Sequence, residues 1–452
     1  MITQRPGDLG YQRARKMFIG RHSEMLPKAV LECETEADVA AALEIARGGP
    51  FAIRGGGHSF AEHSTSDGVV VDLGRLASIE VRNETVVVGP GVRVGALTDT
   101  LAPARRVVPV GWCRSVGVVG AVLGGGYGVL GRYYGLGADH LVSARVMLAD
   151  GRVVRAAPDE HPDLLWALRG AGGGNFGVVL SAELRTRPAV ALTAIRATWP
   201  YERVVDVVAA WQHLVPDAPR EVNLEVSAWA SDFPDEDAAV ALFGVVVGTL
   251  ADAHTVLAAF TDRAGTPSAS SCTGLSPVTA ARHCDYPGDV AEHVLPRLPA
   301  GERPALRLAR SEFFTGPIPR PVVAEMTEHL AGDRVYGVYR DLELIPWGAA
   351  LSEPIGGAFA HRDARFLVKH SVQTGCRASP ETRADAADWV NDSWSITHKV
   401  GSGASYPNYP DLNLPDWPRA YYGVNLPRLR AVKKAYDPDS VFSFAQGLSE
   451  TL

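Results

Sequence analysis

Apolar positions in the first 190 residues fall into short runs, which predict strands, separated by stretches with helical spacing. Thr35 and Asp38 stand three residues apart at the start of one such stretch, a variant of the capping box that marks a helix N-terminus. We expect strands at residues 27–32, 51–53, 68–73, 79–81 and 85–88, and helices at residues 11–20, from residue 35 onward and at 92–101. This mixture predicts an α+β architecture with a mixed sheet.

The pattern changes near Pro188, beyond which longer strand-like runs alternate with amphipathic stretches. Runs at residues 194–198, 223–229 and 242–247 predict strands, and stretches at residues 203–214 and 252–264 predict helices. Residues 266–271 and much of 287–304 are expected to form loops, the latter because prolines recur there. A second domain follows, with an antiparallel sheet covered by helices on one face.

Two later runs, at residues 339–348 and 366–372, alternate with a period of two residues. In the first run, Tyr339, Asp341, Glu343 and Ile345 would lie on one face of a strand. In the second run, one face would carry Val368, His370 and Val372, and the other would carry Leu367, Lys369 and Ser371.

Charge and composition restrict the function classes. Among 452 residues, 44 Lys and Arg stand against 51 Asp and Glu, a net charge of −7 with no basic block, so nucleic acid is not expected as a partner. We see no signal-peptide pattern and no apolar run long enough for a membrane span, and we expect a cytoplasmic protein. The five cysteines include no Cys-x-x-Cys pair, so no metal site is expected and most are interpreted as reduced thiols.

The candidate chemistry begins at Arg54-Gly55-Gly56-Gly57-His58-Ser59-Phe60, directly after an apolar run. Three successive glycines lack Cβ atoms, so the backbone can turn sharply and approach an anionic ligand closely. His58 follows them and can touch whatever they hold. A tight turn that only holds a phosphate is the alternative.

Two further glycine-rich stretches follow, at residues 111–128 and 169–179, and they contain Gly111-Trp112-Cys113-Arg114-Ser115-Val116-Gly117 and Gly172-Gly173-Gly174-Asn175. With these three motifs the chain resembles the berberine bridge enzyme-like FAD-linked oxidases of the vanillyl-alcohol oxidase / p-cresol methylhydroxylase superfamily. The resemblance implies FAD bonded covalently to His58 and Cys113, although a buried structural thiol is the alternative for Cys113. It also implies that the cofactor is bound by Arg54, Gly55, Gly56, Gly57, Ser59, Val116, Gly117, Gly120, Gly124, Gly125, Gly126, Tyr127, Val178, Val179, Tyr422 and Asn425.

The end of the chain supports the same resemblance, because Tyr406-Pro407-Asn408-Tyr409 and Tyr421-Tyr422-Gly423-Val424-Asn425 are similar to the family's C-terminal signature. The implied organisation is a two-subdomain FAD-binding domain of the p-cresol methylhydroxylase type at residues 1–190, with its core at about 25–190. A substrate-binding domain at 191–404 and a segment at 405–452 that returns to the first domain complete it. A dinucleotide fold is the rival, but no Gly-x-Gly-x-x-Gly joins a first strand to a first helix.

Four residues are candidates for catalysis, because a base must take the proton from a substrate hydroxyl or amine while the flavin takes a hydride at N5. By resemblance, Tyr409 faces the flavin and is the first candidate; Glu343 and His370 follow. Lys369 is a cation that could help ionise Tyr409. The alternatives are a core tyrosine, a solvated glutamate, a hydrogen-bonded core histidine and a solvated lysine. Ring-closing members of the family carry a glutamate at or next to Lys369, so ring closure of the berberine type is not predicted.

The predicted activity is oxidation of a sugar, glycoside or secondary-metabolite alcohol with O2 as acceptor and H2O2 as product. By resemblance, Val116 covers the oxygen-reactive face of the flavin, and its small side chain favours access. Ala121 replaces a histidine that is usual in the family. Amine or C–H oxidation in natural-product tailoring is the alternative enzyme function, and a flavin-loaded binding or sensor protein is the alternative outside catalysis. The sequence predicts neither the substrate nor the oligomeric state.

Overall fold

The computed structural model describes residues 1–18, 25–111, 113–282 and 305–448. Its N-terminal part begins with a four-stranded sheet in the order β1-β2-β4-β3, where β2, β4 and β3 are parallel and β1 is antiparallel to β2. Its strands are β1 Ile2–Gln4, β2 Ala29–Glu32, β3 Phe51–Arg54 and β4 Val69–Asp72. Helix α2 (Glu36–Ala46) packs on this sheet, and Thr35 and Asp38 form the predicted capping box at its start.

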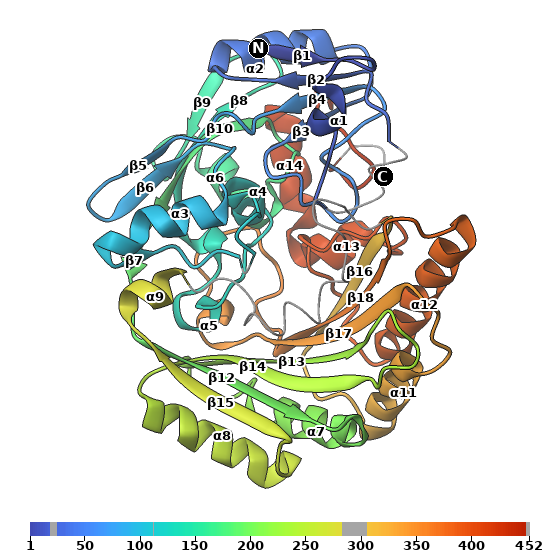
Figure 1. Ribbon diagram of the computed structural model, residues 1–452. Helices are drawn as coiled ribbons and strands as arrows, with labels where there is room; N and C mark the ends of the chain where they lie inside the picture. The colour runs from blue at the N-terminus through green and yellow to red at the C-terminus, as the bar shows by residue number, and fades with distance from the viewer. Residues whose placement is uncertain (19–24, 112, 283–304, 449–452) are drawn as a thin grey trace.

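A second, antiparallel sheet in the order β5-β6-β10-β8-β9 completes this part of the molecule (Figure 1). Its strands are β5 Ile79–Val81, β6 Thr85–Val88, β8 Leu141–Met147, β9 Val153–Ala156 and β10 Val178–Arg185, and β7 Arg106–Val107 pairs separately with β11 Arg187–Pro188. The helices are α1 Tyr11–Ala14, α3 Val94–Leu101, α4 Val118–Leu123, α5 Gly131–Tyr134 and α6 Pro162–Ala171. The hairpin predicted from residues 79–88 is confirmed.

A seven-stranded antiparallel sheet forms the other half, in the order β15-β12-β14-β13-β17-β18-β16. Its strands are β12 Leu192–Trp199, β13 Val222–Ala230, β14 Ala239–Val247, β15 Ala269–Leu275, β16 Arg307–Phe314, β17 Val338–Pro346 and β18 Phe366–Thr374. Helices α7 (Val204–Leu214), α8 (Leu250–Ala264), α11 (Arg320–Ala331) and α12 (Pro380–His398) cover one face (Figure 1), and α9 (Pro277–Arg282) lies at an edge. The predicted antiparallel sheet with helices on one face is confirmed.

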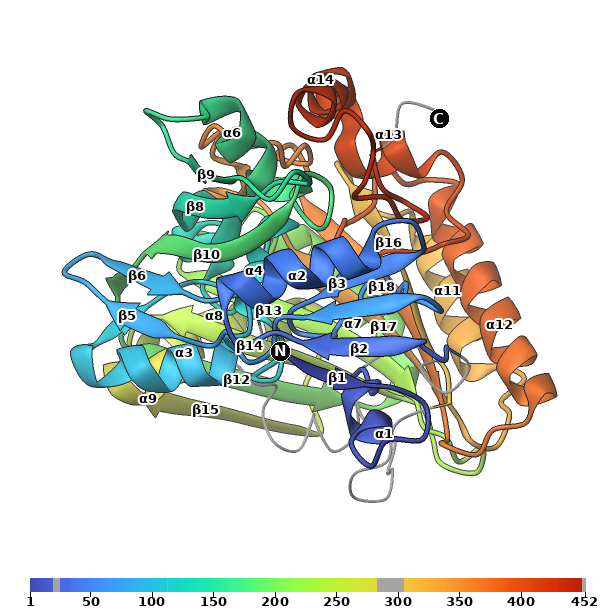
Figure 2. The ribbon, with the colours of Figure 1, turned by 90° about the horizontal axis from the view of Figure 1, so that it is seen from above.

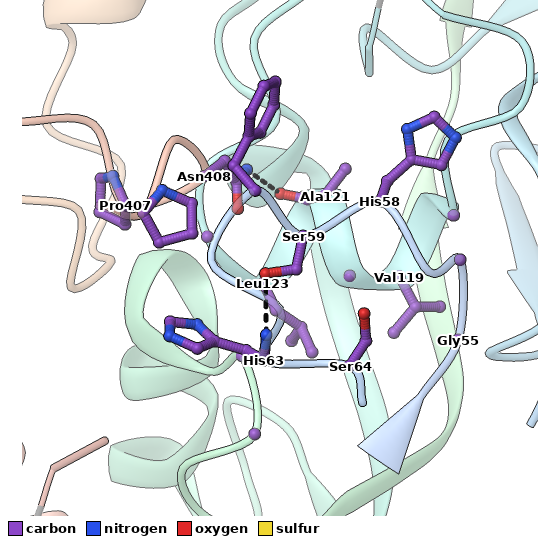
Figure 3. Close-up of a pocket in the computed structure, with 18 of the residues that line it drawn as sticks. Gly55, His58, Ser59, His63, Ser64, Val119, Ala121, Leu123, Pro407 and Asn408 are labelled. Carbon is purple, nitrogen blue, oxygen red and sulfur yellow. Dashed lines mark hydrogen bonds between the residues drawn. The ribbon is translucent and has the colours of Figure 1, made fainter. Parts of the chain in front are cut away.

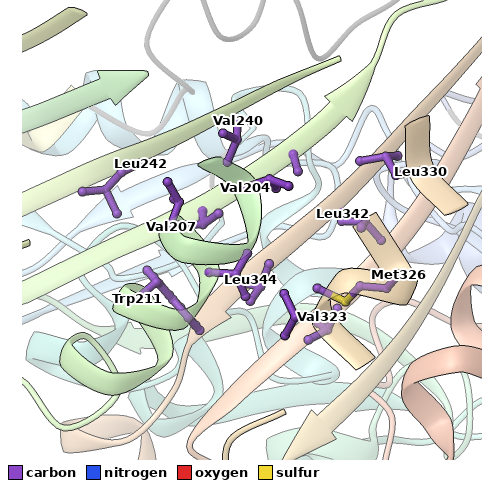
Figure 4. Close-up of a cluster of buried hydrophobic side chains, with 14 of the residues drawn as sticks. Val204, Val207, Trp211, Val240, Leu242, Val323, Met326, Leu330, Leu342 and Leu344 are labelled. Atoms are coloured by element: carbon purple, nitrogen blue, oxygen red, sulfur yellow. The ribbon is translucent and has the colours of Figure 1, made fainter. Parts of the chain in front are cut away.

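The helix-covered face of this sheet is a close-packed apolar core. Figure 4 shows Val207 and Trp211 of α7 facing Leu344 of β17, with Val323 and Met326 of α11 beside them. The large helices α11 and α12 lie side by side (Figure 2), which extends the core to the edge strands. Burial of these side chains, worth about 1.5–3 kcal/mol each, holds the helices on this face and leaves the other face toward the first half of the molecule.

The last described segment returns to the first half of the molecule through α13 (Trp417–Tyr422) and α14 (Leu426–Tyr436). Leu429 and Val432 of α14 share one hydrophobic cluster with α6. The buried Lys433 ammonium donates to the Asn175 carbonyl at 2.7 Å and pairs with Asp437 at 2.5 Å, which ties this segment to the third glycine motif. The exact domain limits near residues 190 and 404 remain a prediction.

Two sequence expectations about elements are wrong. Residues 266–271 were expected to form a loop, but β15 begins at Ala269 and pairs with β12 along its length. Its side chains are small, mostly exposed and at the sheet edge, so it shows no apolar alternation. The helix expected at residues 11–20 ends at Ala14 in the described chain. Residues 287–304, expected to be mostly loop, lie outside the described residues.

Candidate active site

A cavity of about 680 Å³ lies between the glycine motifs and the uncovered face of the seven-stranded sheet. Figure 3 shows His58, Ser59 and His63 on the loop after β3, and Pro407 and Asn408 of the returning segment on the opposite side of the view from His58. Glu343 of β17 and Lys369 of β18 line the cavity from the sheet. The volume is typical of a small-molecule or cofactor site.

The first two glycine motifs touch backbone to backbone. A Cβ on Gly56 would lie 2.5 Å from the amide nitrogen of Gly117, and one on Gly117 would lie 2.8 Å from the Cα of Gly56. Only glycine fits at either position, because backbone atoms cannot move aside as a side chain can. Arg93, which sequence reasoning missed, donates to the carbonyls of Gly56 and Ser115 and holds the two turns together.

His58 and Cys113 converge on one hydroxyl group. The His58 Nε2 and the Cys113 Sγ each lie 3.1 Å from the Ser115 Oγ. The His58 ring is also stacked on Phe18, with ring centres 4.0 Å apart, which fixes the plane of the imidazole. Two nucleophilic side chains from different loops therefore face the same part of the cavity.

The returning segment closes the cavity by hydrogen bonds to the second glycine motif. The Tyr406 hydroxyl accepts from the Gly126 amide at 2.8 Å, and the Asn408 side-chain amide donates to the Ala121 carbonyl at 2.9 Å (Figure 3). The hydroxyls of Tyr409 and Tyr127 are 2.6 Å apart. Residues 282 positions apart in the chain thus form one wall.

One end of the cavity is formed by three candidate catalytic residues, Tyr409, Glu343 and Lys369. The Lys369 Nζ pairs with the Glu343 carboxylate at 2.7 Å and lies 5.4 Å from the centre of the Tyr409 ring. Tyr409 lies deep in the molecule, and its remaining exposed surface faces the cavity. Burial raises the pKa of Tyr409 well above its usual value, and the Glu343 charge raises it further, so the phenol stays protonated at neutral pH. Because Glu343 balances Lys369, the lysine favours ionisation of Tyr409 less than a lone cation would.

Behind this end, the cavity side of the sheet carries buried polar groups without partners. Neither carboxylate oxygen of Glu225 has a hydrogen-bond partner among the described residues, and the same is true of the hydroxyls of Ser227 and Tyr339. Burial, and then the charge of Glu343, raises the pKa of Glu225 well above its usual value. Sequence reasoning missed Glu225. The polar alternation of Glu225 and Ser227 within an apolar strand was the available signal.

The catalytic role expected for the remaining candidate, His370, is wrong. Its ring nitrogens bond to the Ser393 hydroxyl at 2.8 Å and the Thr397 hydroxyl at 2.9 Å, both on α12. His370 therefore lies on the helix-covered face, opposite the cavity, as the alternation with Lys369 requires. The alternative of a hydrogen-bonded core histidine is the one that the structure shows.

Four expected cofactor contacts also lie outside the cavity wall. Arg54 turns inward to the Asp72 carboxylate at 2.9 Å, because alternation in β3 points it away from the loop. Val178 packs in the core between the two small sheets, and Asn425 donates to the Ala358 carbonyl at 3.0 Å. Gly125 is backed by the Tyr406 and Phe359 rings. The other expected residues line the cavity: Gly55, Gly56, Gly57, His58, Ser59, Cys113, Val116, Gly117, Gly120, Gly124, Gly126, Tyr127, Val179 and Tyr422, with Tyr409, Glu343 and Lys369.

The residues present fit a flavin dinucleotide. Glycine turns that no Cβ could enter offer backbone amides for a diphosphate, and His58 and Cys113 stand where a ring system can lie between them and Tyr409. Across the described residues, no group of three His, Cys, Asp or Glu side chains is placed to hold a metal ion. Among the helices of the described chain, none combines the length and the apolar character of a membrane span.

Comparisons with known proteins agree with this site. A family model described as FAD binding domain matches residues 27–157, and one described as berberine and berberine like matches residues 405–449. The first range contains His58 and Cys113, and the second contains Tyr409. The matched ranges thus contain the first two glycine motifs and the returning segment, whereas Glu343 and Lys369 lie outside both.

Full-length relatives and solved structures extend the similarity. An uncharacterised FAD-linked oxidoreductase of Bacillus subtilis is 28% identical over 452 residues, covering 98% of this chain and 95% of that protein. The chitooligosaccharide oxidase of Gibberella zeae is 26% identical over 447 residues, covering 93% and 87%. The structure of BBE-like 1 of Physcomitrella patens matches with a TM-score of 0.86 and 26% identity, over 99% of this chain and 96% of that chain. The chain is an FAD-linked oxidoreductase that contains an FAD binding domain and a berberine-like segment, and it is similar along its length to berberine bridge enzyme-like oxidases.

Proposed function

We propose that this enzyme oxidises a hydroxyl group of a sugar, glycoside or secondary-metabolite alcohol, with FAD bonded to both His58 and Cys113. The electrons then pass to O2 and yield H2O2. The observation that carries the proposal is the convergence of His58 and Cys113 on Ser115, in a cavity whose other end presents Glu343, Lys369 and Tyr409. The similarity to a chitooligosaccharide oxidase supports a carbohydrate as substrate.

Bound FAD supplies the two-electron acceptor for this chemistry. The chain must supply a base for the hydroxyl proton and must orient the alcohol. Because burial keeps Tyr409 protonated, the carboxylate of Glu343 is the better proton acceptor at neutral pH. The Tyr409 hydroxyl then holds the substrate oxygen in place, and Lys369 keeps the charge of the cluster balanced. This assignment reverses the order of the two candidates expected from sequence.

Covalent attachment is tested by acid precipitation of the purified protein, after which the yellow colour should stay with the polypeptide. His58→Ala and Cys113→Ala should each retain one linkage in peptide maps, and the double variant should release all its flavin. Ser59→Ala, at another cavity-lining position, is the control and should retain both linkages. Free FAD in the supernatant of the parent would contradict the proposal.

The substrate class is tested by anaerobic mixing with panels of sugars, other alcohols and amines, followed by air. Sugars or other alcohols should bleach the flavin, and air should restore it within seconds with release of H2O2. Val116→Leu should slow the return while leaving bleaching unchanged, because Val116 lines the cavity. Bleaching by amines alone would favour the alternative activity, and reoxidation over minutes would indicate another electron acceptor.

A further inference from the structure

Three charged side chains line the described cavity: Arg307, Glu343 and Lys369, all on the seven-stranded sheet. Glu343 and Lys369 neutralise each other at 2.7 Å. Arg307, the first residue of β16, therefore leaves the lining with one excess positive charge. Its guanidinium has no carboxylate within 4.0 Å among the described residues.

The surroundings of Arg307 are those of a binding residue rather than of a structural ion pair. Its guanidinium carbon lies 5.6 Å from the centre of the Phe60 ring, a weak contact with an aromatic face. The side chain is partly buried, so its charge is less screened than that of a surface arginine. The buried Asp341 carboxyl feels the positive charge only as the smallest of the influences on its pKa.

Phe60 also contacts Tyr409, so Arg307 lies close to a candidate catalytic residue. The centre of the same ring is 5.4 Å from that of Tyr409, in an edge-to-face arrangement. Arg307 and Tyr409 thus lie against one side chain, and a single small molecule can reach both. A guanidinium presents a planar fork of N–H donors, which matches the two oxygens of a carboxylate.

We propose that Arg307 binds a carboxylate carried by the substrate, so that the enzyme prefers acidic carbohydrates or hydroxy acids over their neutral counterparts. This inference rests on the proposed function and specifies its substrate class. Sugar acids with a ring carboxylate and open-chain aldonic acids share this chemistry, and both belong in the test.

The test compares a matched pair in anaerobic flavin reduction, cellobiouronic acid against cellobiose, and includes lactobionate as an aldonic acid. A charge-assisted hydrogen bond contributes about 1.5–3 kcal/mol, so the acid should be favoured about 10–100-fold, mainly through apparent affinity. Arg307→Gln should remove the preference without slowing the neutral sugar, and Arg307→Lys should restore part of it. Arg320→Gln, on the exposed surface of α11, is the control. Equal use of acid and neutral sugar by the parent would overturn the inference.

Two further readouts separate this inference from the proposed function. Gluconate and glucuronate should perturb the flavin absorbance of the parent saturably, but not that of Arg307→Gln, even if no panel member is oxidised. The absence of that perturbation in the parent would overturn the inference. The FAD content of Arg307→Gln should equal that of the parent; lost FAD would assign Arg307 to the cofactor instead.

Discussion

The two faces of the seven-stranded sheet are both buried, but they differ in whether their polar side chains have hydrogen-bond partners. On the helix-covered face, His370 has both ring nitrogens bonded to hydroxyls of α12. On the cavity face, Glu225, Ser227 and Tyr339 are just as buried and lack partners among the described residues. A folded chain rarely leaves buried polar groups unpaired, so their concentration on one face marks where ligand or water is received. Buried carboxyl and hydroxyl groups without partners therefore distinguish the cavity face, which burial alone does not.

The largest expected effect is on the rate of flavin reduction, when candidate catalytic residues on the cavity face are replaced. Glu343→Gln should slow flavin reduction about 10²–10⁴-fold, the usual contribution of a positioned base. Tyr409→Phe should cost about 10–100-fold, as the loss of one charge-assisted hydrogen bond does. Stopped-flow reduction measures both rates. Asp341→Asn, on the same strand face but outside the cavity lining, is the control. If Tyr409→Phe lost more rate than Glu343→Gln, Tyr409 rather than Glu343 would be the base.

The next effect is on stability. Lys369→Met should lower the free energy of unfolding by about 3–5 kcal/mol, because it leaves the Glu343 carboxylate buried and unpaired. Removing both charges, in Lys369→Met/Glu343→Met, should regain most of that loss while abolishing activity. Arg220→Met breaks the exposed pair with Glu353 and should cost less than about 1 kcal/mol. Equal losses in urea titrations would show that Lys369 is better solvated than its burial indicates.

A smaller pair of changes should have opposite signs on the two faces. Glu225→Met should stabilise the protein by about 1–3 kcal/mol, since it removes a desolvated carboxyl that has no partner among the described residues. His370→Leu should destabilise it by about 1–3 kcal/mol, because the Ser393 hydroxyl loses its partner. Thermal unfolding of both variants gives the comparison. A destabilised Glu225→Met would mean that Glu225 is bound to water or ligand in solution.

The smallest effect at neutral pH concerns His370 alone. Burial, and then the charges of Arg310 and His329, lower the pKa of His370 to about 3, against about 6.5 in an unfolded chain. As the pH falls below 6.5, His370 is protonated in the unfolded chain but stays neutral in the native state, so stability is lost down to about pH 3. His370→Gln should flatten the decline of Tm between pH 6.5 and 4 and leave flavin reduction at pH 7 unchanged. If the decline of Tm in His370→Gln matched that of the parent, a group other than His370 would be responsible for the loss of stability at low pH.

Strand alternation and glycine motifs, which can be recognised within short stretches of sequence, predicted part of the site. Alternation with a period of two placed Glu343 with Asp341 on one face of its strand and separated Lys369 from His370 on the other strand, but it left two roles open for His370. The glycine motifs marked His58 and Cys113. Arg54 was misassigned because its partner, Asp72, is on a neighbouring strand that the motif does not include.

Other features depend on contacts between distant segments, which no local pattern carries. The alternation in β13 separates Glu225 from Leu224 and Val226, but it does not show which face of the sheet is turned toward the cavity. Arg307 was missed because its importance comes from its contact with Phe60, which belongs to the loop after β3, far away in the sequence. Arg93 likewise joins two turns that are remote from each other in sequence.

The bond between Tyr127 and Tyr409 has a consequence for biosynthesis. The two residues are 282 positions apart, and a ribosome adds about 5–20 residues per second, so roughly 15–60 s pass between their synthesis. During that time the glycine turns can fold, but the wall formed by Tyr406, Asn408 and Tyr409 does not yet exist. The completed pocket, and any flavin linkage that needs it, must therefore arise after translation of this segment. Chains that stall before residue 405 should accumulate as colourless intermediates.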